Sequence, residues 1–225
     1  MSESARYWDE IYTKTPFRDC KIPNEFLVQM LPRMQKGKVL DVAMGEGTNA
    51  VYLAQKGFQV KGFDISHIAV EHASQLSRDS GVNIEVKCTD LDLYLMGLME
   101  YDSIIMTYFR PAFTRYYSEI IRALKQGGTL LVESYGLHEM KEPIGKDENY
   151  KNFYFSPNEL LKGLSGLRIL YYQEGSVGGR DVVQCLAQKP VDKHAAMFDM
   201  FDMKSGGKEA EKSKQLELAE KLFKK

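Results

Sequence analysis

The chain is poor in cysteine and tryptophan, and its cysteines form no recognisable framework. Its 225 residues contain one tryptophan and three cysteines, at positions 20, 88 and 185. An odd, widely spaced set fits neither a disulfide scaffold nor the ligand spacing of a zinc site. We therefore expect free thiols and no metal centre, which suits a cytoplasmic protein.

Long apolar runs and an excess of one charge are also missing. No stretch approaches the roughly 18 apolar residues of a membrane span, and the N-terminal segment lacks the apolar core of a signal peptide. Lysine and arginine number 30 against 31 aspartate and glutamate, a net charge of -1. Nucleic-acid binders usually carry a basic stripe that neutralises phosphates, and only the last twenty residues suggest one. A soluble protein with a small-molecule partner, no membrane span and no nucleic acid is expected.

Strand and helix patterns alternate through most of the chain. Short apolar, β-branched runs predict strands at 38–43, 58–64, 83–88, 101–107, 129–134, 167–174 and 181–189. Amphipathic patterns predict helices at 3–14, 23–34, 48–56, 66–80, 113–124 and 157–164. Such alternation produces βαβ units and a parallel sheet, whereas the final two strands follow one another directly. The predicted fold is α/β: a doubly wound, mostly parallel seven-stranded sheet with an antiparallel edge strand.

Turn and cap residues give the expected boundaries. Pro23 should open the second helix, while Ser66 and Ser156 should cap later helices. Gly127-Gly128 should form a turn, and residues 175–180 should join the last two strands.

The composition changes near residue 190. We expect a main domain at 1–189 and an extension at 190–225, which contains a short apolar cluster, a glycine linker and a charged, helix-compatible tail. Such a tail is commonly a frayed or weakly docked helix. The alternative is a contact with a partner protein or a membrane surface.

The strongest chemical signal is a glycine-rich turn between a strand and a helix. Gly45-Glu46-Gly47-Thr48-Asn49-Ala50 fits the pattern G-x-G-x-x-A, a dinucleotide fingerprint that is weak when it stands alone. Glycines permit a tight turn, and free N–H groups at a helix start favour an anionic or polar ligand group.

Two acids strengthen this signal. Asp41 lies on the first strand, four residues before Gly45, where a carboxylate is costly unless a ligand meets it. A cationic ligand group, such as the amino-acid end of S-adenosylmethionine, would do so. Asp64 ends the next strand, where an acid can hold the two hydroxyls of a ribose.

With these residues, the segment 39–64 resembles the cofactor motif of class I S-adenosylmethionine-dependent methyltransferases. Residues 5–189 resemble the tellurite-resistance (TehB-like) branch, which shares its arrangement with thiopurine methyltransferase relatives. The resemblance implies a Rossmann-like methyltransferase fold and the cofactor S-adenosyl-L-methionine. Further residues implied to contact the cofactor are Trp8, Tyr12, Ala43, Gly47, Ile65, Asp90, Leu91 and Thr107.

The chain departs from the family pattern at two positions. Ala43 replaces the first glycine of the motif, and the last turn carries Arg180 without the histidine that often accompanies it. The candidate catalytic or acceptor-contacting residues are Tyr108, Arg110, His138 and Arg180. Because no general base is obvious, a soft acceptor is favoured: a thiol, or a selenium or tellurium oxyanion.

Other interpretations remain open for these residues and for the whole chain. The acids could cap turns and helices, the aromatic residues could fill the core, and the cations could be solvated. One alternative function is an NAD(P)-dependent oxidoreductase, which would share the glycines and Asp64. Another is a non-catalytic protein that binds S-adenosylmethionine and regulates a partner through its tail.

Overall fold

A mixed α/β architecture surrounds one sheet in the computed structural model, which describes residues 2–14, 22–137 and 154–191. The strands are β1 Lys38–Val42, β2 Gln59–Asp64, β3 Ile84–Cys88, β4 Tyr101–Thr107, β5 Leu124–Gly136, β6 Tyr154–Phe155, β7 Arg168–Val177 and β8 Arg180–Gln188. The helices are α1 Glu3–Lys14, α2 Glu25–Met30, η1 Leu31–Arg33, α3 Thr48–Gln55, α4 His67–Asp79, η2 Leu91–Leu93, α5 Arg115–Ala123 and α6 Glu159–Gly163. Cys20, His138 and the predicted tail lie outside the described residues.

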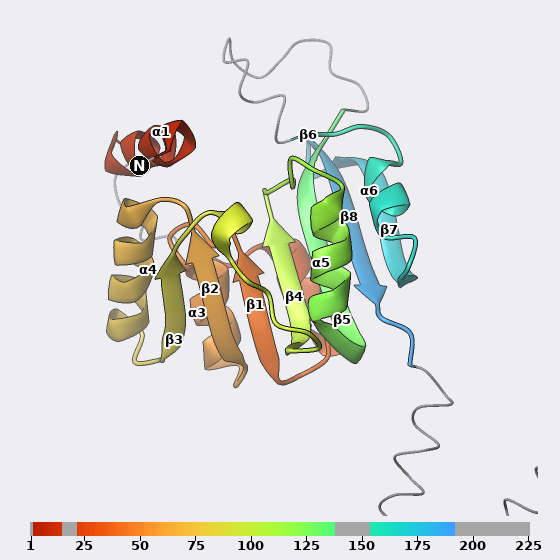
Figure 1. The fold of residues 1–225 in the computed structure, drawn as a ribbon, viewed down its shortest axis with the longest axis horizontal. Helices are drawn as coiled ribbons and strands as arrows, with labels where there is room; N and C mark the ends of the chain where they lie inside the picture. The colour runs from red at the N-terminus through yellow and green to blue at the C-terminus, as the bar shows by residue number, and fades with distance from the viewer. Residues whose placement is uncertain (1, 15–21, 138–153, 192–225) are drawn as a thin grey trace, which may run out of the picture. The chain divides into compact units, whose positions relative to one another are not determined.

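The strand order confirms the predicted fold class. Seven strands follow the order β3-β2-β1-β4-β5-β8-β7, and the short β6 pairs with β5 off this path (Figure 1). Strands β1 to β5 pair in parallel, while β8 is antiparallel to both of its neighbours, β5 and β7. From β1, the strands β2 and β3 are added toward one edge of the sheet, whereas β4 and β5 are added toward the other. The sheet therefore has a topological switch point between β1 and β4, and α/β folds usually bind ligands at such a point.

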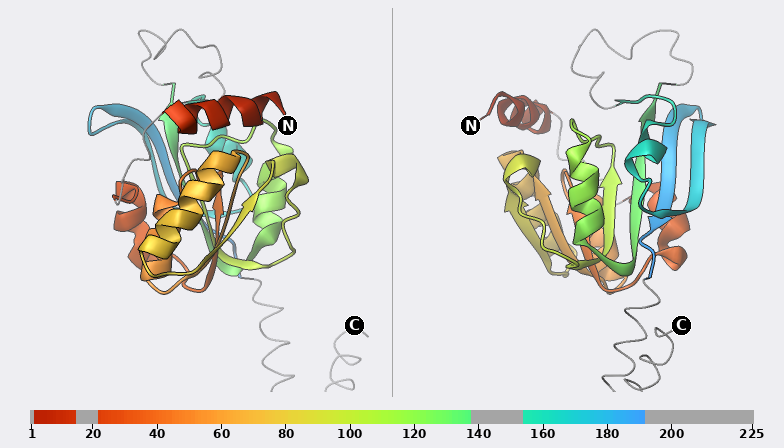
Figure 2. Two further views of the ribbon diagram at one scale, coloured as in Figure 1. Left: turned by 90° about the vertical axis from the view of Figure 1, so that its left-hand side faces the viewer. Right: turned by 45° about the vertical axis from the view of Figure 1, so that its right-hand side comes forward.

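Helices cover both faces of the sheet (Figures 1 and 2). Successive side chains of a strand point to opposite faces, so the apolar residues of the central strands need a covering layer on each side. On one face, Leu40 and Ile104 belong to a core that includes residues of α5 and α6. On the other, Val39 and Ile105 belong to a core with residues of α2, α3 and α4. Within the described ranges, no helix is both long and apolar enough to cross a membrane.

Several predicted boundaries are corrected by the structure. The helix expected at 23–34 is shorter, because Asn24 caps it by accepting a hydrogen bond from the Leu27 N–H, and the chain then tightens into η1. Ser66 caps α4 as predicted. Ser156 does not cap α6, since Asn158 occupies that position with a φ of 60° and makes no side-chain capping bond.

Two predicted turns also differ. Gly127-Gly128 lies inside β5, where the pairing with β4 shifts register between Tyr101 and Ser103, so the glycines form part of an irregularity in the ladder. The expected turn at 175–180 narrows to Gly178-Gly179, with φ values of 58° and 80°. A two-residue turn with both φ values positive matches the twist of the flanking strands, which therefore extend further than predicted.

Candidate functional site

The glycine-rich turn lies at the carboxyl end of β1, directly before α3. Gly45 and Gly47 adopt left-handed φ values of 55° and 79°. A side chain at Gly47 would put its Cβ 2.7 Å from the Cβ of Ala73 on α4, so glycine is needed for helix packing. At Gly45, a Cβ would lie 2.8 Å from the hydroxyl of Tyr12 on α1. The turn is thus shaped by two close approaches, one from each of these helices.

Ala43 occupies the position of the first glycine in the methyltransferase motif that this segment resembles. Its φ is 53°, a left-handed conformation that strains residues other than glycine. Ala43 therefore adopts a backbone conformation that glycine would adopt more readily.

Replacing Ala43 with glycine is expected to raise the free energy of unfolding by about 0.5–1 kcal/mol, because relief of the left-handed strain exceeds the added freedom of the unfolded chain. Chemical denaturation measures this. Ala54→Gly, within α3, is the matched control and should lower stability by a similar amount. Equal destabilisation by both substitutions would contradict the strained conformation of Ala43.

Asp41 is buried on β1 without a hydrogen-bond partner among the described residues. It is 0% exposed, and neither carboxylate oxygen accepts a hydrogen bond from the part of the chain that the structure describes. Burial raises the pKa of this carboxyl well above its usual range, and the charge of Asp64 raises it further. An uncompensated acid in the interior is costly, so a cationic or donating ligand group would stabilise it.

Asp64 braces the glycine turn from the end of β2. One carboxylate oxygen accepts from the Gly45 N–H at 2.9 Å, and the other accepts from the Ser66 N–H, also at 2.9 Å. Burial raises the pKa of Asp64, whereas backbone hydrogen bonds oppose this rise. Each carboxylate oxygen can accept more than one hydrogen bond, so Asp64 can hold the turn and still receive ligand hydroxyls.

Helix α1 covers this end of the sheet with two aromatic residues. The rings of Trp8 and Tyr12 lie 5.9 Å apart, and Tyr12 faces Gly45. Burial raises the pKa of Tyr12, with further contributions from Asp64 and Glu46. The phenol therefore stays protonated and can donate a hydrogen bond at physiological pH.

The residues expected at the adenine are spread more widely. Ile65 is half-buried, and its carbonyl accepts from the Cys88 thiol at 3.7 Å. Asp90 caps η2 by accepting from the Asp92 N–H at 3.0 Å, while Leu91 packs into the core at 9% exposure. This local hydrogen bond gives Asp90 a structural role as the cap of η2.

A buried polar network lies beside the turn, at the ends of β4 and β5. Glu133 is 4% exposed and accepts from the Asn24 amide at 2.6 Å, the Tyr108 hydroxyl at 2.9 Å and the Gln184 amide at 2.6 Å. Asn24 connects this carboxylate to α3, since its N–H donates to Asn49 at 2.8 Å. The Asn49 amide in turn donates to Thr107 at 2.9 Å. The network links the expected acceptor side to the start of α3.

The candidate cations fall into different environments. Arg180 donates to the Tyr108 hydroxyl at 2.9 Å, so it belongs to the Glu133 network. Arg110 instead forms an ion pair with Glu159 of α6 at 2.7 Å. Tyr108 has a φ of 53°, and its ring centroid lies 5.1 Å from that of Tyr135. The structure therefore joins Tyr108 to Arg180 and separates Arg110 from them.

Asn24, Asn49 and Gln184 were not singled out by the sequence. Their hydrogen bonds span up to 109 positions along the chain, as for Asn24 and Glu133, and no local pattern marks such pairs. From this network, the sequence singled out Thr107, Tyr108 and Arg180.

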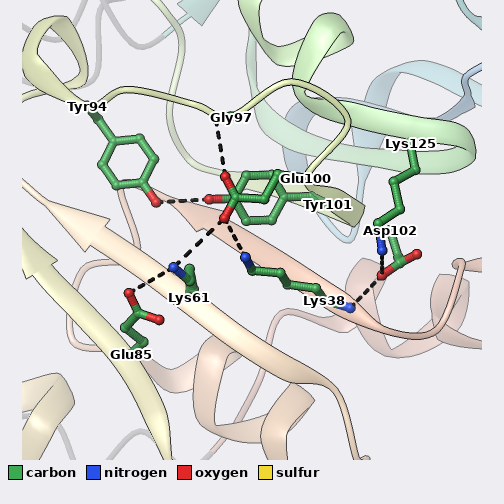
Figure 3. Close-up of polar contacts among 9 residues, drawn as sticks. All are labelled: Lys38, Lys61, Glu85, Tyr94, Gly97, Glu100, Tyr101, Asp102 and Lys125. Atoms are coloured by element: carbon green, nitrogen blue, oxygen red, sulfur yellow. Dashed lines mark hydrogen bonds and ion pairs between the residues drawn. The ribbon is translucent and has the colours of Figure 1, made fainter.

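A second polar cluster lies toward the amino ends of the strands (Figure 3). Lys61 bridges Glu85 at 2.9 Å and Glu100 at 3.8 Å, while Lys38 also pairs with Glu100. A cavity of about 250 Å³ adjoins these residues. Because its charges are matched and ligands of open α/β sheets bind at the carboxyl ends, this cluster is a structural feature.

Comparison with known proteins identifies a domain in the middle of the chain. Residues 39–128 match the family model of a methyltransferase domain. A relative from Pyrococcus abyssi, a tRNA (uracil(54)-C(5))-methyltransferase, is 29% identical over an alignment of 116 residues that covers 45% of this chain and 28% of the relative. The chain thus spans little more than a quarter of that protein.

Solved structures share the fold at about 20% identity. One, described with the conversion of a disulfide bond into a thioacetal group during echinomycin biosynthesis, has 20% identity and a TM-score of 0.67 and covers 91% of this chain and 100% of its own. TehB from Haemophilus influenzae has 20% identity and a TM-score of 0.62, covering 82% and 66%. An S-adenosylmethionine-dependent methyltransferase from Methanosarcina mazei has 20% identity and a TM-score of 0.59, covering 75% and 99%.

The domain match and the shared fold agree with the site built around the glycine turn. Residues 39–128 contain all of β1 but its first residue, together with the turn, Asp41 and Asp64. This segment matches a methyltransferase domain, and the chain shares its fold with solved methyltransferase structures.

Proposed function

We propose that this protein transfers a methyl group from S-adenosylmethionine to a small-molecule acceptor, with residues 1–189 as the methyltransferase domain and 190–225 as an extension. The observation that carries the proposal is Asp41, a fully buried carboxylate beside a glycine turn, both of whose oxygens lack a hydrogen-bond partner within residues 2–14, 22–137 and 154–191. A ligand with a cationic end would relieve the cost of burying this charge.

The residues at the turn fit the cofactor. When bound, S-adenosylmethionine would supply a methyl group activated by a positive sulfur. Asp41 would contact the cationic amino-acid end of the cofactor, and Asp64 would accept hydrogen bonds from the ribose hydroxyls. Gly45 would let the cofactor lie close to the backbone of the turn. Tyr12 would cover the ligand from α1. Ile65 and Asp90 are proposed neighbours of the adenine.

Tyr108 and Arg180 are the proposed acceptor contacts, held by Glu133. The Arg180 guanidinium donates to the Tyr108 hydroxyl, which itself donates to Glu133. Tyr108 and Glu133 are hydrogen-bonded to each other, so neither is an obvious general base for the acceptor. A thiolate or a selenium or tellurium oxyanion needs alignment more than proton removal, and alignment can lower a barrier by about 7–11 kcal/mol. The echinomycin-related structure and TehB lend this acceptor class support by analogy of fold alone.

Methyl-labelled S-adenosylmethionine tests this proposal directly. The protein is incubated with 2-mercaptoethanol, selenite, tellurite and unfractionated tRNA in parallel. Label transferred to a small acceptor is the expected result, and Arg180→Ala should reduce it. Label transferred to tRNA alone would contradict the small-molecule proposal. Binding without transfer to any of them would favour a non-catalytic binding protein.

A further inference from the structure

Helix α1 is attached to α4 through one carboxylate. Asp9 Oδ1 accepts a hydrogen bond from the Ser66 hydroxyl at 2.6 Å, and the Ile68 N–H donates to the same oxygen at 3.4 Å. Both views in Figure 2 show α1 next to the end of α4 at which these residues lie. Asp9 therefore acts as a cap for α4, although it belongs to a different helix.

The amino end of α4 suits such a contact. Ser66 already accepts from the Ala69 N–H at 3.1 Å, so Asp9 adds a second acceptor for the free donors of the first turn. The partial positive charge at a helix start also favours a carboxylate. The contact joins two helices separated by 57 positions in the chain, so it is a tertiary link.

Trp8 and Tyr12 lie on the same helix as Asp9, so their positions depend on where Asp9 holds that helix. Asp9 and Tyr12 are three residues apart, so they lie on neighbouring positions of one helical face. With Asp9 hydrogen-bonded to α4, the Tyr12 hydroxyl lies 2.8 Å from the position that a Cβ atom at Gly45 would occupy. We propose that Asp9 is a positioning residue for the cofactor, because its bonds to α4 hold α1 and Tyr12 over the glycine turn.

This inference rests on the proposed function. The negative charges near the site link the attachment of α1 to the binding of a cationic cofactor. Asp9 and Asp64 are near enough that the Asp9 charge adds to the rise that burial causes in the pKa of Asp64. Asp41 is a third acid in the same region. A cationic ligand offsets repulsion among these acids, so its binding strengthens the attachment of α1, and by linkage the attachment strengthens binding.

Trp8 provides the measurement, because it is the chain's single tryptophan and precedes Asp9 directly. Acrylamide quenching of its fluorescence, measured without ligand, reports whether α1 is attached. Asp9→Ala is expected to raise the quenching constant, and Asp9→Asn, which keeps an accepting oxygen without the charge, should give an intermediate value. Glu10→Ala is the control, since it also removes an acid from α1 but only breaks an exposed pair with Lys14.

Calorimetric titration with S-adenosylhomocysteine completes the test on the same proteins. Asp9→Ala should weaken binding by about 5-fold or more, whereas Glu10→Ala should match the unsubstituted chain. Unchanged quenching in Asp9→Ala would overturn the attachment, and raised quenching with unchanged affinity would overturn the positioning role. If the unsubstituted protein does not bind S-adenosylhomocysteine, the proposed function and the positioning role fail, while the attachment is still decided by quenching without ligand.

Discussion

Replacing Asp41 with asparagine is expected to stabilise the unliganded protein at neutral pH while weakening S-adenosylmethionine binding. The substitution removes a buried charge that has no hydrogen-bond partner among the residues described, so the free energy of unfolding should rise by about 1–3 kcal/mol. Loss of a charge-assisted hydrogen bond to the cofactor should weaken binding about 10–100-fold. Thermal denaturation and calorimetry measure the two effects on one preparation.

The effect of Asp41 on stability should depend on pH. Because its folded pKa lies above the unfolded value of 3.8, the folded state holds the proton more tightly. The stability that this contributes is present below the unfolded pKa and is lost as the pH rises through the folded one. The gain from Asp41→Asn should therefore grow with pH across that interval.

Asp102→Asn is the matched control for Asp41. Asp102 is an acid with partners, the Lys125 ammonium and the Lys38 N–H, both at 2.8 Å (Figure 3). This substitution should lower stability and leave cofactor affinity unchanged. If Asp41→Asn behaved in the same way, Asp41 would be a structural carboxylate and not a ligand for the cofactor.

Replacing Glu133 with alanine is expected to cost about 3–5 kcal/mol of stability, the largest loss that we predict. The substitution leaves the buried Gln184 amide and the half-buried donors of Asn24 and Tyr108 without their acceptor, and an unsatisfied group costs about 1–3 kcal/mol when it is buried. Chemical denaturation measures the loss. Glu133→Gln should lower stability less than Glu133→Ala, because its amide oxygen can still accept hydrogen bonds. Some loss remains, because the NH₂ group must face a donor that the carboxylate accepted from.

Glu85→Gln is the control for Glu133. Glu85 is 68% exposed in its pair with Lys61, so its loss should change stability by about 1 kcal/mol or less. A Glu133→Ala variant as stable as Glu85→Gln would show that the network does not hold the ends of β4 and β5 together.

The sequence predicts best what local patterns determine. The strand at 101–107 is found with the same bounds, because it contains the apolar run Ile104-Ile105-Met106, and Ser66 caps α4 as its position before the helix predicts. The Gly127-Gly128 turn was wrong, because these glycines lie within β5 at the register shift with β4 and exchange backbone hydrogen bonds with Lys189. A dipeptide of glycines marks a change of direction locally but cannot reveal a neighbouring strand.

The candidate site divides in the same way. Asp41, Gly45 and Asp64 could be found because they share one contiguous βαβ segment, and the structure brings them together. The pairing of Arg110 with Glu159 and the chain from Glu133 through Asn24 to Asn49 depend on side chains that meet only after folding. Asp9 also gave no signal, because a cap supplied by another helix has no fixed spacing.

The most direct test of the account is calorimetric titration with S-adenosylhomocysteine, NAD and NADP, on the unsubstituted protein and on Asp64→Ala. Asp64 holds the Gly45 N–H, so its loss should disturb the turn as well as the ribose contact. The account predicts saturable binding of S-adenosylhomocysteine alone, lost or strongly weakened in Asp64→Ala. Binding of NAD or NADP without S-adenosylhomocysteine would contradict it and favour an oxidoreductase.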